Sequence, residues 1–263
     1  MVEMSGYKVT GAGFAYDGHP ALRDVNLTLA PGRFYGLVGP NGCGKTTLLD
    51  LLTGNKAPDL GTVCYGRTSV VDLPRRELAR QVALVPQDFG IGFAFTVEEV
   101  VLMGRHPYIK RFGAPSAEDH RLVAEAMELI GIDHFRHRYV NELSGGEKQR
   151  VVVARALAQD TPVILFDEAT SNLDVQYTLQ IFNVARKLVR DQGRTVIAVI
   201  HNLNLAAAYC DEVIFMKKGH IISHGPTDQV MVAETIKDVF GVESRVQLDP
   251  FSNTQQISFK YWS

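Results

Sequence analysis

The stretch Gly39-Pro40-Asn41-Gly42-Cys43-Gly44-Lys45-Thr46-Thr47 decides the fold, because it has the G-x-x-x-x-G-K-[ST] spacing of a phosphate-binding loop. The apolar run before it, residues 34–38, is typical of a buried parallel strand, and residues 48–52 after it favour a helix. Glycines let backbone N–H groups curve around phosphate oxygens, and a helix N-terminus adds donors with partial positive charge. The alternative is a glycine-rich turn with a surface lysine, and the strand–loop–helix context favours phosphate binding.

Three side chains of this loop have expected roles. Lys45 can reach the β- and γ-phosphates of a nucleotide, and the Thr46 hydroxyl can ligate Mg²⁺. Cys43 is expected to be a small side chain that fits the loop, although positive surroundings could instead lower its pKa. Cys43, Cys64 and Cys210 lie far apart in no metal-ligand spacing, which indicates reduced thiols.

The composition is that of an ordinary globular protein. The 263 residues are 46% hydrophobic and 21% charged, enough for a large core. A net charge of −2 argues against a protein built to bind nucleic acid. No apolar run approaches the roughly 20 residues that span a bilayer, and the N-terminus shows no export signal. We therefore expect a cytosolic protein that meets a membrane only through a partner.

Hydrophobic periodicity predicts an α/β fold. Antiparallel strands are expected at residues 7–14 and 24–30, and helices without strands at 95–158, where Thr96–Glu99 and Ser116–Asp119 have the spacing of capping boxes. Other expected elements are strands at 62–65, 82–85, 163–166, 196–200 and 213–216, a helix at 175–192, and a C-terminal helix and hairpin.

A second motif follows the apolar strand predicted at residues 163–166. Asp167 and Glu168 stand at its carboxyl end, where open parallel sheets bind their ligands. An aspartate there suits Mg²⁺, and the following glutamate can orient and polarise an attacking water molecule. A solvated strand end is the alternative.

A third motif, residues 143–150 (LSGGEKQR), precedes a helix. Ser144 and Glu147 have the spacing of a capping box, so a well-capped helix would explain them alone. Gly145 and Gly146 also expose backbone at the helix start, which predicts a second anion site.

The motifs together resemble the nucleotide-binding subunit of ATP-binding cassette (ABC) transporters, over about residues 7 to 250. The resemblance implies a P-loop NTPase (RecA-like) core with an antiparallel β subdomain and an inserted α-helical subdomain. It predicts one domain, 1–263, with the core at 1–94 and 159–225, the helical subdomain at 95–158 and a short extension at 226–263.

The resemblance also assigns roles, by motifs in the family order. Tyr16 matches the aromatic that stacks on adenine, Gln87 the glutamine that contacts Mg²⁺ and water, and His201 the histidine that touches the γ-phosphate. The remaining matches are Gly39 to Thr47 (Walker A loop), Ser144-Gly145-Gly146-Glu147 (LSGGQ signature), Asp167 and Glu168 (Walker B aspartate and catalytic base) and Ser171-Asn172-Leu173-Asp174 (D-loop).

Two positions depart from the family pattern. Glu147 stands where glutamine is usual, which adds a negative charge near a polyphosphate and predicts weaker or slower ATP engagement. Ala169 stands where proline often follows the Asp-Glu pair, and it removes only a conformational constraint.

The resemblance implies a motor for a transporter. Two copies would sandwich ATP and Mg²⁺ between Lys45 of one copy and Ser144–Gly146 of the other, at the cytoplasmic face of the inner membrane. Expected partners are membrane permease subunits and, indirectly, a periplasmic or surface substrate-binding protein, with no nucleic acid. Residues 95–108 and 239–250 resemble the corresponding segments in the ATPases of metal-chelate importers. The substrates of that group are ferric siderophores, haem, cobalamin, or molybdate and tungstate. Alternatives are a soluble ABC ATPase without a permease, a nucleotide-gated module without turnover, and the ATPase of an importer or exporter for another substrate.

Overall fold

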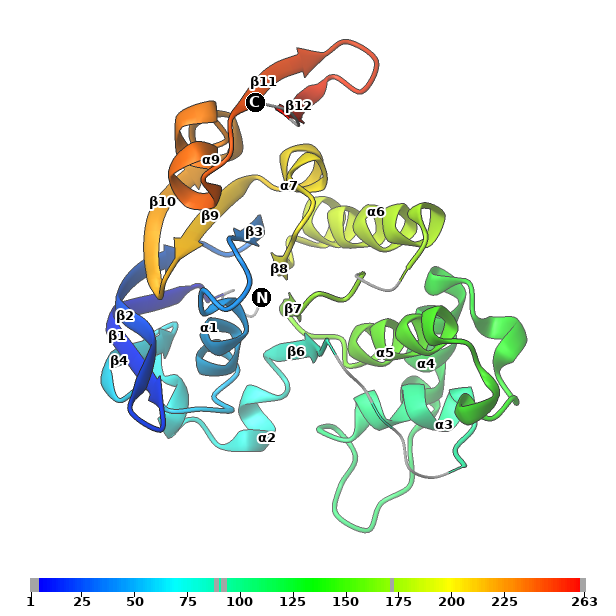
Figure 1. The fold of residues 1–263 in the computed structure, drawn as a ribbon. Helices are drawn as coiled ribbons and strands as arrows, with labels where there is room; N and C mark the ends of the chain where they lie inside the picture. The colour runs from blue at the N-terminus through cyan, green and yellow to red at the C-terminus, as the bar shows by residue number, and fades with distance from the viewer. Residues whose placement is uncertain (1–4, 88–89, 91–93, 171–172, 261–263) are drawn as a thin grey trace. The chain divides into compact units, whose positions relative to one another are not determined.

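Figure 1 shows the fold in a computed structural model that describes residues 5–87, 90, 94–170 and 173–260. The chain divides into two compact units, which we call unit 1 (Met1–Leu73 with Thr195–Ser263) and unit 2 (Pro74–Arg194). The phosphate loop belongs to unit 1, and the Asp167-Glu168 pair and the Ser144 segment belong to unit 2. None of the helices described is long and apolar enough to cross a bilayer.

Unit 1 contains two sheets and a C-terminal hairpin. In the first sheet, β1 pairs antiparallel with β2 and β4, and β5 pairs with β4. In the second, β3 lies between β8 and β9 and is parallel to both, while β10 pairs antiparallel with β9. The strands are β1 (Tyr7–Tyr16), β2 (His19–Leu29), β3 (Phe34–Val38), β4 (Leu60–Tyr65), β5 (Thr68–Ser69), β8 (Thr195–Val199), β9 (Glu212–Lys217), β10 (His220–Pro226), β11 (Ser244–Asp249) and β12 (Thr254–Phe259).

The burial of the strands explains this arrangement. All five residues of β3 are buried, as a central parallel strand requires, whereas Tyr7–Thr10 of β1 alternate between buried and exposed. The Tyr7 hydroxyl donates to the Leu52 carbonyl of α1 at 3.0 Å and so ties the first sheet to that helix. The helices of unit 1 are α1 (Lys45–Leu52), α7 (Leu203–Tyr209), α8 (Thr227–Val230), α9 (Ala233–Phe240) and the 3₁₀ turn η1 (Val70–Asp72).

Unit 2 combines a short parallel strand pair with helices. Strands β6 (Val82–Val85) and β7 (Val163–Phe166) pair in register, so that Val85 lies beside Phe166. The helices are α2 (Arg75–Leu78), α3 (Val97–Leu102), α4 (Ala117–Ile130), α5 (Gly145–Ala158), α6 (Val175–Gln192) and the 3₁₀ turns η2 (Met103–Arg105), η3 (Asp133–Phe135) and η4 (Val140–Glu142). Helices α3, α4 and α5 pack against one another through buried apolar side chains.

Capping residues fix where these three helices begin. Thr96, Ser116 and Ser144 are the N-caps of α3, α4 and α5, and each forms a reciprocal capping box with the acidic residue three positions on. Helix α4 ends at Gly131, which adopts the left-handed conformation.

Most predicted elements are confirmed, including the antiparallel N-terminal strands, the helix at 175–192 and the C-terminal hairpin. Strand β10 and the short β5 were not predicted, because glycine and polar residues interrupt their apolar pattern. The proposed division into core, helical subdomain and extension stays a prediction.

Candidate functional site

The phosphate loop connects β3 to α1, and its backbone donors face no acidic side chain of that helix. Gly44 is the N-cap of α1 with φ 104°, no side chain caps the helix, and its first turn contains no acidic residue. The Lys45 ammonium donates to the carbonyls of Gly39 at 2.9 Å and Pro40 at 3.0 Å, and the side chain is only 5% exposed. A buried lysine beside an uncapped helix N-terminus suits a polyphosphate anion.

Glycine is needed at positions 39, 42 and 44 of the loop for a different physical reason at each. A Cβ on Gly39 would lie 2.2 Å from the Met216 carbonyl oxygen, and one on Gly44 would lie 2.6 Å from that of Ala21. Gly42 has φ 73° and open space where its Cβ would be. Close packing therefore requires glycine at position 39, and close packing and the positive φ together require it at position 44. At position 42 the positive φ favours glycine, and the space beside Gly42 is open to a ligand.

Cys43 fills space at the base of the loop. It is buried, and a Cβ on Gly39 would lie 2.8 Å from its sulfur. Burial raises the pKa of the Cys43 thiol, and the nearby positive charge of Lys45 opposes this only in part. The alternative of a thiol with a lowered pKa is therefore wrong, because desolvation outweighs the loop's positive charge.

Tyr16 lies beside the phosphate loop. Its hydroxyl is 3.4 Å from the Thr47 hydroxyl, and its ring, which is 42% exposed, meets Phe14 edge-on at 4.9 Å. The Lys56 ammonium lies 4.9 Å from the centre of the Tyr16 ring. An exposed, braced ring next to the loop can stack on a base, and Lys56 is a candidate that the sequence reasoning missed.

His201 reaches the same edge of the second sheet as the loop. Val199 at the end of β8 lies beside Leu37 of β3, and the Ile200 N–H donates to the Leu37 carbonyl at 3.1 Å. The chain therefore leaves β8 next to where it leaves β3 for the loop. Unit 1 thus brings Tyr16, the phosphate loop and the exposed His201 to one edge.

Unit 2 brings Gln87, Asp167 and Glu168 together at the carboxyl ends of β6 and β7. The Asp167 N–H donates to the Val85 carbonyl at 2.9 Å, and Asp167 is 6% exposed. The Gln87 Nε2 donates to the Glu168 Oε2 at 2.8 Å, and Glu168 has φ 50°, a strained value for a residue with a Cβ. This strained turn aims the carboxylate at the Gln87 amide, a contact that sequence spacing could not predict.

The oxygen donors suit Mg²⁺ by their chemistry. Within unit 2, Asp167 offers a carboxylate and Gln87 an amide oxygen, since its nitrogen is the atom that donates to Glu168. Within unit 1, Thr46 offers a hydroxyl at the start of α1. Mg²⁺ prefers such hard oxygen ligands and usually keeps waters and substrate phosphates as its other ligands. The described part of the chain contains no group of three or more His, Cys, Asp or Glu side chains arranged to hold a metal ion by themselves.

Glu147 closes the capping box of α5 and binds the Ser144 hydroxyl. The backbone N–H and the hydroxyl of Ser144 both donate to Glu147 Oε2, each at 2.7 Å. These hydrogen bonds lower the pKa of the Glu147 carboxyl, and the one from the Ser144 hydroxyl has the larger effect. Gly145 has open space where a Cβ would lie. The start of α5 is therefore accessible to a ligand at Gly145, but the Ser144 hydroxyl already donates its proton to the Glu147 carboxylate.

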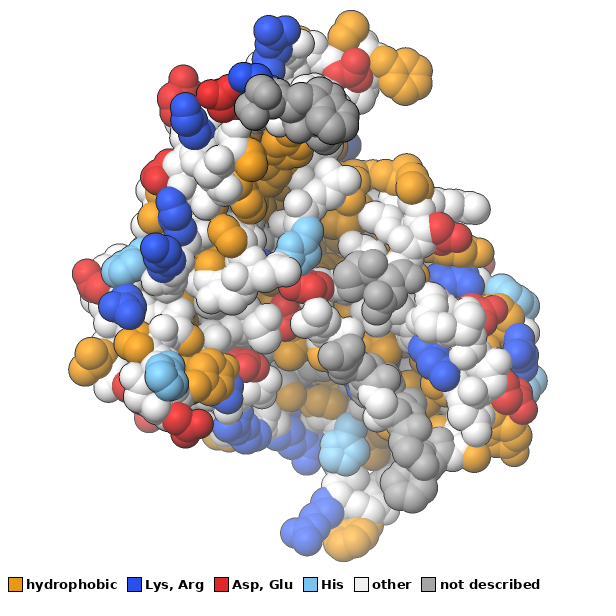
Figure 2. All heavy atoms as spheres, viewed as in Figure 1, with side chains coloured by type: hydrophobic (Ala, Val, Ile, Leu, Met, Phe, Trp, Pro, Cys, Tyr) orange, Lys and Arg blue, Asp and Glu red, His pale blue; other side chains and the backbone are white. Residues whose placement is uncertain are grey.

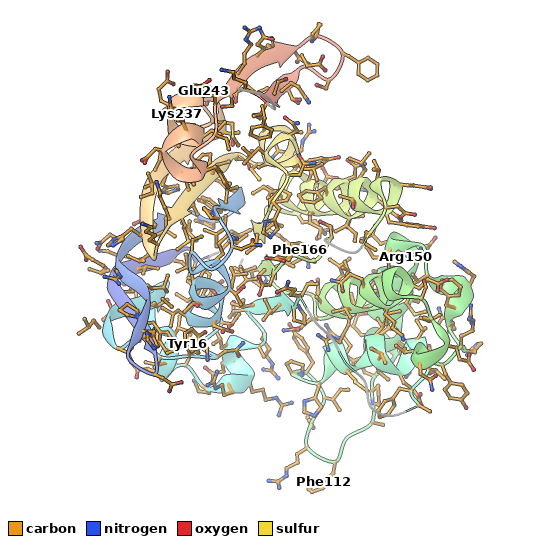
Figure 3. The ribbon with its side chains drawn as sticks, viewed as in Figure 1. Tyr16, Phe112, Arg150, Phe166, Lys237 and Glu243 are labelled. Atoms are coloured by element: carbon orange, nitrogen blue, oxygen red, sulfur yellow. The ribbon has the colours of Figure 1, made fainter. Side chains whose placement is uncertain are left out.

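Two observations concern the segment between β7 and α6. Asp174 is the N-cap of α6 but makes no side-chain cap bond, whereas Ser171 and Asn172 lie outside the described residues. The guanidinium of Arg150, a residue that is 6% exposed and is labelled in Figure 3, lies 4.0 Å from the centre of the Tyr177 ring and so joins α5 to the start of α6. This contact was also missed, because 27 residues separate its partners.

Known proteins resemble the chain in sequence. A family model described as ABC transporter matches residues 22–171. A cobalamin import ATP-binding protein of Halobacterium salinarum is 42% identical over 92% of this chain, which spans 60% of that relative's length. An iron(3+)-hydroxamate import ATP-binding protein of Bacillus subtilis is 35% identical over 92% of this chain and 90% of its own. A hemin import ATP-binding protein of Bordetella pertussis is 38% identical over 90% of this chain and 92% of its own.

Solved structures agree with the predicted fold class. An ABC transporter assigned to the metal-chelate type, in an inward-facing conformation, matches with a TM-score of 0.84 at 28% identity over 97% of both chains. The dimeric ATP-binding cassette MJ0796 bound to ADP and Pi matches with a TM-score of 0.75 at 31% identity, covering 84% of this chain and 98% of its own. The P-loop NTPase fold is thereby confirmed, and the chain belongs to the ABC transporter family.

Proposed function

We propose that this chain is the ATP-hydrolysing subunit of an ABC importer that takes up a metal chelate. The observation that carries the hydrolytic part is the hydrogen bond between Gln87 and Glu168 at a strained strand end beside buried Asp167. A binding module without turnover needs no such positioned carboxylate, whereas a hydrolase needs one to orient water.

The proposed roles follow from the geometry within each unit. Lys45 and the N–H groups of the loop bind the polyphosphate, and the exposed Tyr16 ring stacks on the base. Glu168 orients the attacking water and accepts its proton, and His201 contacts the γ-phosphate. Bound Mg²⁺ would neutralise charge that develops on the phosphates, with Thr46, Gln87 and Asp167 as the side chains that hold it.

The proposed assembly is a pair of copies that close around ATP. The start of α5 is open at Gly145, so a phosphate on a second copy can approach its backbone donors. The dimeric cassette among the similar structures supports this arrangement. We propose further that the pair docks on membrane permease subunits at the cytoplasmic face of the inner membrane and serves a periplasmic or surface substrate-binding protein.

The proposed cargo class comes from the relatives. Their names refer to cobalamin, iron(3+)-hydroxamate and hemin, which are all chelated metals. Molybdate or tungstate also remains within the class predicted from the sequence.

Uptake in cells tests the cargo and the coupling together. Cells that lack the chain would receive the parent, Lys45→Ala or Glu168→Gln, and then labelled cobalamin, iron(3+)-hydroxamate or hemin. The proposal expects the parent alone to restore accumulation of one of these chelates and to co-purify with a membrane permease. Uptake that ignores both substitutions, or a chain that purifies without any permease, would favour the soluble ABC ATPase instead.

A further inference from the structure

The segment between η2 and α4 carries positive charge that the proposed function leaves unused. This segment, residues 106–115, is called here the basic loop. It contains Lys110, Arg111 and His106 and no aspartate or glutamate. None of the ion pairs found among the described residues involves Lys110 or Arg111. The whole chain has a net charge of −2, so this positive charge is local.

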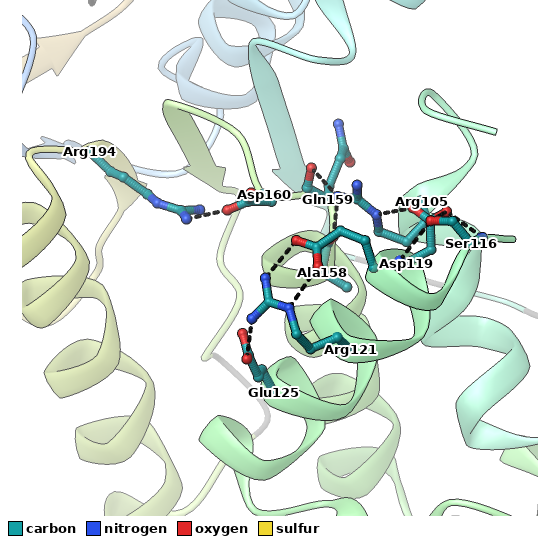
Figure 4. Close-up of polar contacts among 10 residues, drawn as sticks. Arg105, Ser116, Asp119, Arg121, Glu125, Ala158, Gln159, Asp160 and Arg194 are labelled. Carbon is teal, nitrogen blue, oxygen red and sulfur yellow. Dashed lines mark hydrogen bonds and ion pairs between the residues drawn. The ribbon is translucent and has the colours of Figure 1, made fainter. Parts of the chain in front are cut away.

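The base of the basic loop is anchored by arginines. The Arg76 Nε donates to the Pro107 carbonyl at 2.8 Å and its Nη2 to the Ile109 carbonyl at 2.5 Å. The guanidinium of Arg105 lies 4.0 Å from the centre of the Tyr108 ring. Arg105 is itself fixed by its ion pair with Asp119, drawn in Figure 4. The loop is therefore held in place at its base.

The tip of the basic loop exposes an aromatic ring in a strained backbone. Phe112 is 97% exposed and has φ 64°, and the Gly113 N–H donates to the Lys110 carbonyl at 2.8 Å to close the turn. Figure 3 shows Phe112 at the end of the loop, pointing away from the helices of its unit. A bulky residue rarely adopts positive φ, and the Arg111 guanidinium, 5.4 Å from the ring centre, leaves the Phe112 ring almost fully exposed to solvent. Such strain favours a role for the ring outside the chain.

A cavity of about 790 Å³ adjoins the tip. Arg75, Arg76, Lys110 and Arg111 line it beside apolar side chains, and none of the described lining residues is acidic. Figure 2 shows blue and orange side chains together at the end of the loop. Cations around an apolar floor match a ligand that has a phosphate group joined to an aliphatic part.

We propose that the basic loop is a membrane contact of this chain's own, which binds the headgroups of anionic phospholipids. Phe112 enters the interface between headgroups and acyl chains, while Lys110 and Arg111 at the tip bind lipid phosphates. A protein partner would need a pocket for Phe112 and roughly 800 Å² of contact on each side, more than one narrow loop offers. A lipid surface needs no such pocket.

Vesicle flotation of the full chain tests this proposal. Vesicles of phosphatidylcholine alone are compared with vesicles of equal parts phosphatidylcholine and phosphatidylglycerol. Each cation near an anionic surface strengthens binding about fivefold, so Lys110→Gln with Arg111→Gln is expected to weaken it about 25-fold. Phe112→Asn is expected to weaken it several-fold, and asparagine keeps the positive φ at little cost. High salt should abolish most of the binding.

The chain offers matched controls. Lys187→Gln with Lys237→Gln removes the same charge from exposed sites elsewhere, and Phe251→Asn removes a ring that is 99% exposed in the β11–β12 turn. Neither control should change binding. Equal losses in the controls and the loop variants would overturn the proposal, as would no preference for anionic vesicles. Binding only to vesicles that contain a permease would also overturn it and would assign the loop to a protein interface.

Discussion

The ion pair between Arg105 and Asp119 is buried, and its loss should destabilise unit 2 strongly. Arg105 Nε lies 2.8 Å from Asp119 Oδ1, and the two residues are 5% and 6% exposed. The Arg105 Nη1 also donates to the carbonyls of Ala158 at 2.9 Å and Gln159 at 3.2 Å (Figure 4). One guanidinium therefore joins η2, the first turn of α4 and the end of α5.

Arg105→Met should be strongly destabilising. It leaves a buried carboxylate without its counter-charge and removes the donor from two carbonyls. Breaking a buried pair in this way costs about 3–5 kcal/mol. At roughly 2–4 °C per kcal/mol for a protein of this size, the melting temperature should fall by about 10 °C. Arg105→Met with Asp119→Asn should lose less than the sum of the two single variants, because the pair is coupled.

The assay is urea unfolding followed by circular dichroism, with Arg121→Met as the matched control. Arg121 pairs with Glu118 on the same helix as Asp119, but the two side chains are 52% and 59% exposed. Such an exposed pair adds little to stability, because water and salt screen its charges. If Arg105→Met costs no more than Arg121→Met, or if the double-variant losses simply add, the reasoning about the buried pair is refuted.

Three further predictions follow from single contacts. Burial raises the pKa of Asp119, but hydrogen bonds from Ser116 and Arg105 lower it further, to about 2. Since the folded pKa is below the unfolded value of about 3.9, this stability is present above pH 4 and is lost as the pH falls towards 2. When the free energy of unfolding is measured as the pH falls from 4 to 2, the parent should lose about 2 kcal/mol more than Asp119→Asn does. Glu147→Gln should free the Ser144 hydroxyl and raise the rate of ATP hydrolysis severalfold in a phosphate-release assay, and an unchanged or lower rate would count against that role. Arg150→Lys should lose the stacking on Tyr177 and about 1 kcal/mol in urea unfolding, which an unchanged midpoint would contradict.

Local patterns predicted much of the fold because they act over a few residues. The phosphate loop and the capping boxes at Thr96, Ser116 and Ser144 are complete within nine residues or fewer, and the structure has them at the predicted places. The capping boxes need only the order of side chains along one turn of helix. The same holds for β3, whose unbroken apolar run predicts burial on both faces.

Contacts between distant segments were beyond that reasoning. Arg105 meets Ala158 across 53 positions and Gln87 meets Glu168 across 81, so no spacing rule identifies them. The raised pKa of Cys43 was likewise hidden, because the extent of burial depends on packing against Gly39 and not on the loop sequence. The roles of the site residues remain predictions that variants must test.

The most direct test of the account is phosphate release from ATP by Glu168→Gln. Glu168→Gln should still bind ATP and form a stable pair of copies, since Lys45 and the loop are unchanged, but it should release almost no phosphate. The control Glu128→Gln, at an exposed position on α4, should release phosphate at the parent rate. If Glu168→Gln released phosphate as fast as the parent, Glu168 would not be the base, and the proposed way in which this chain hydrolyses ATP would be contradicted.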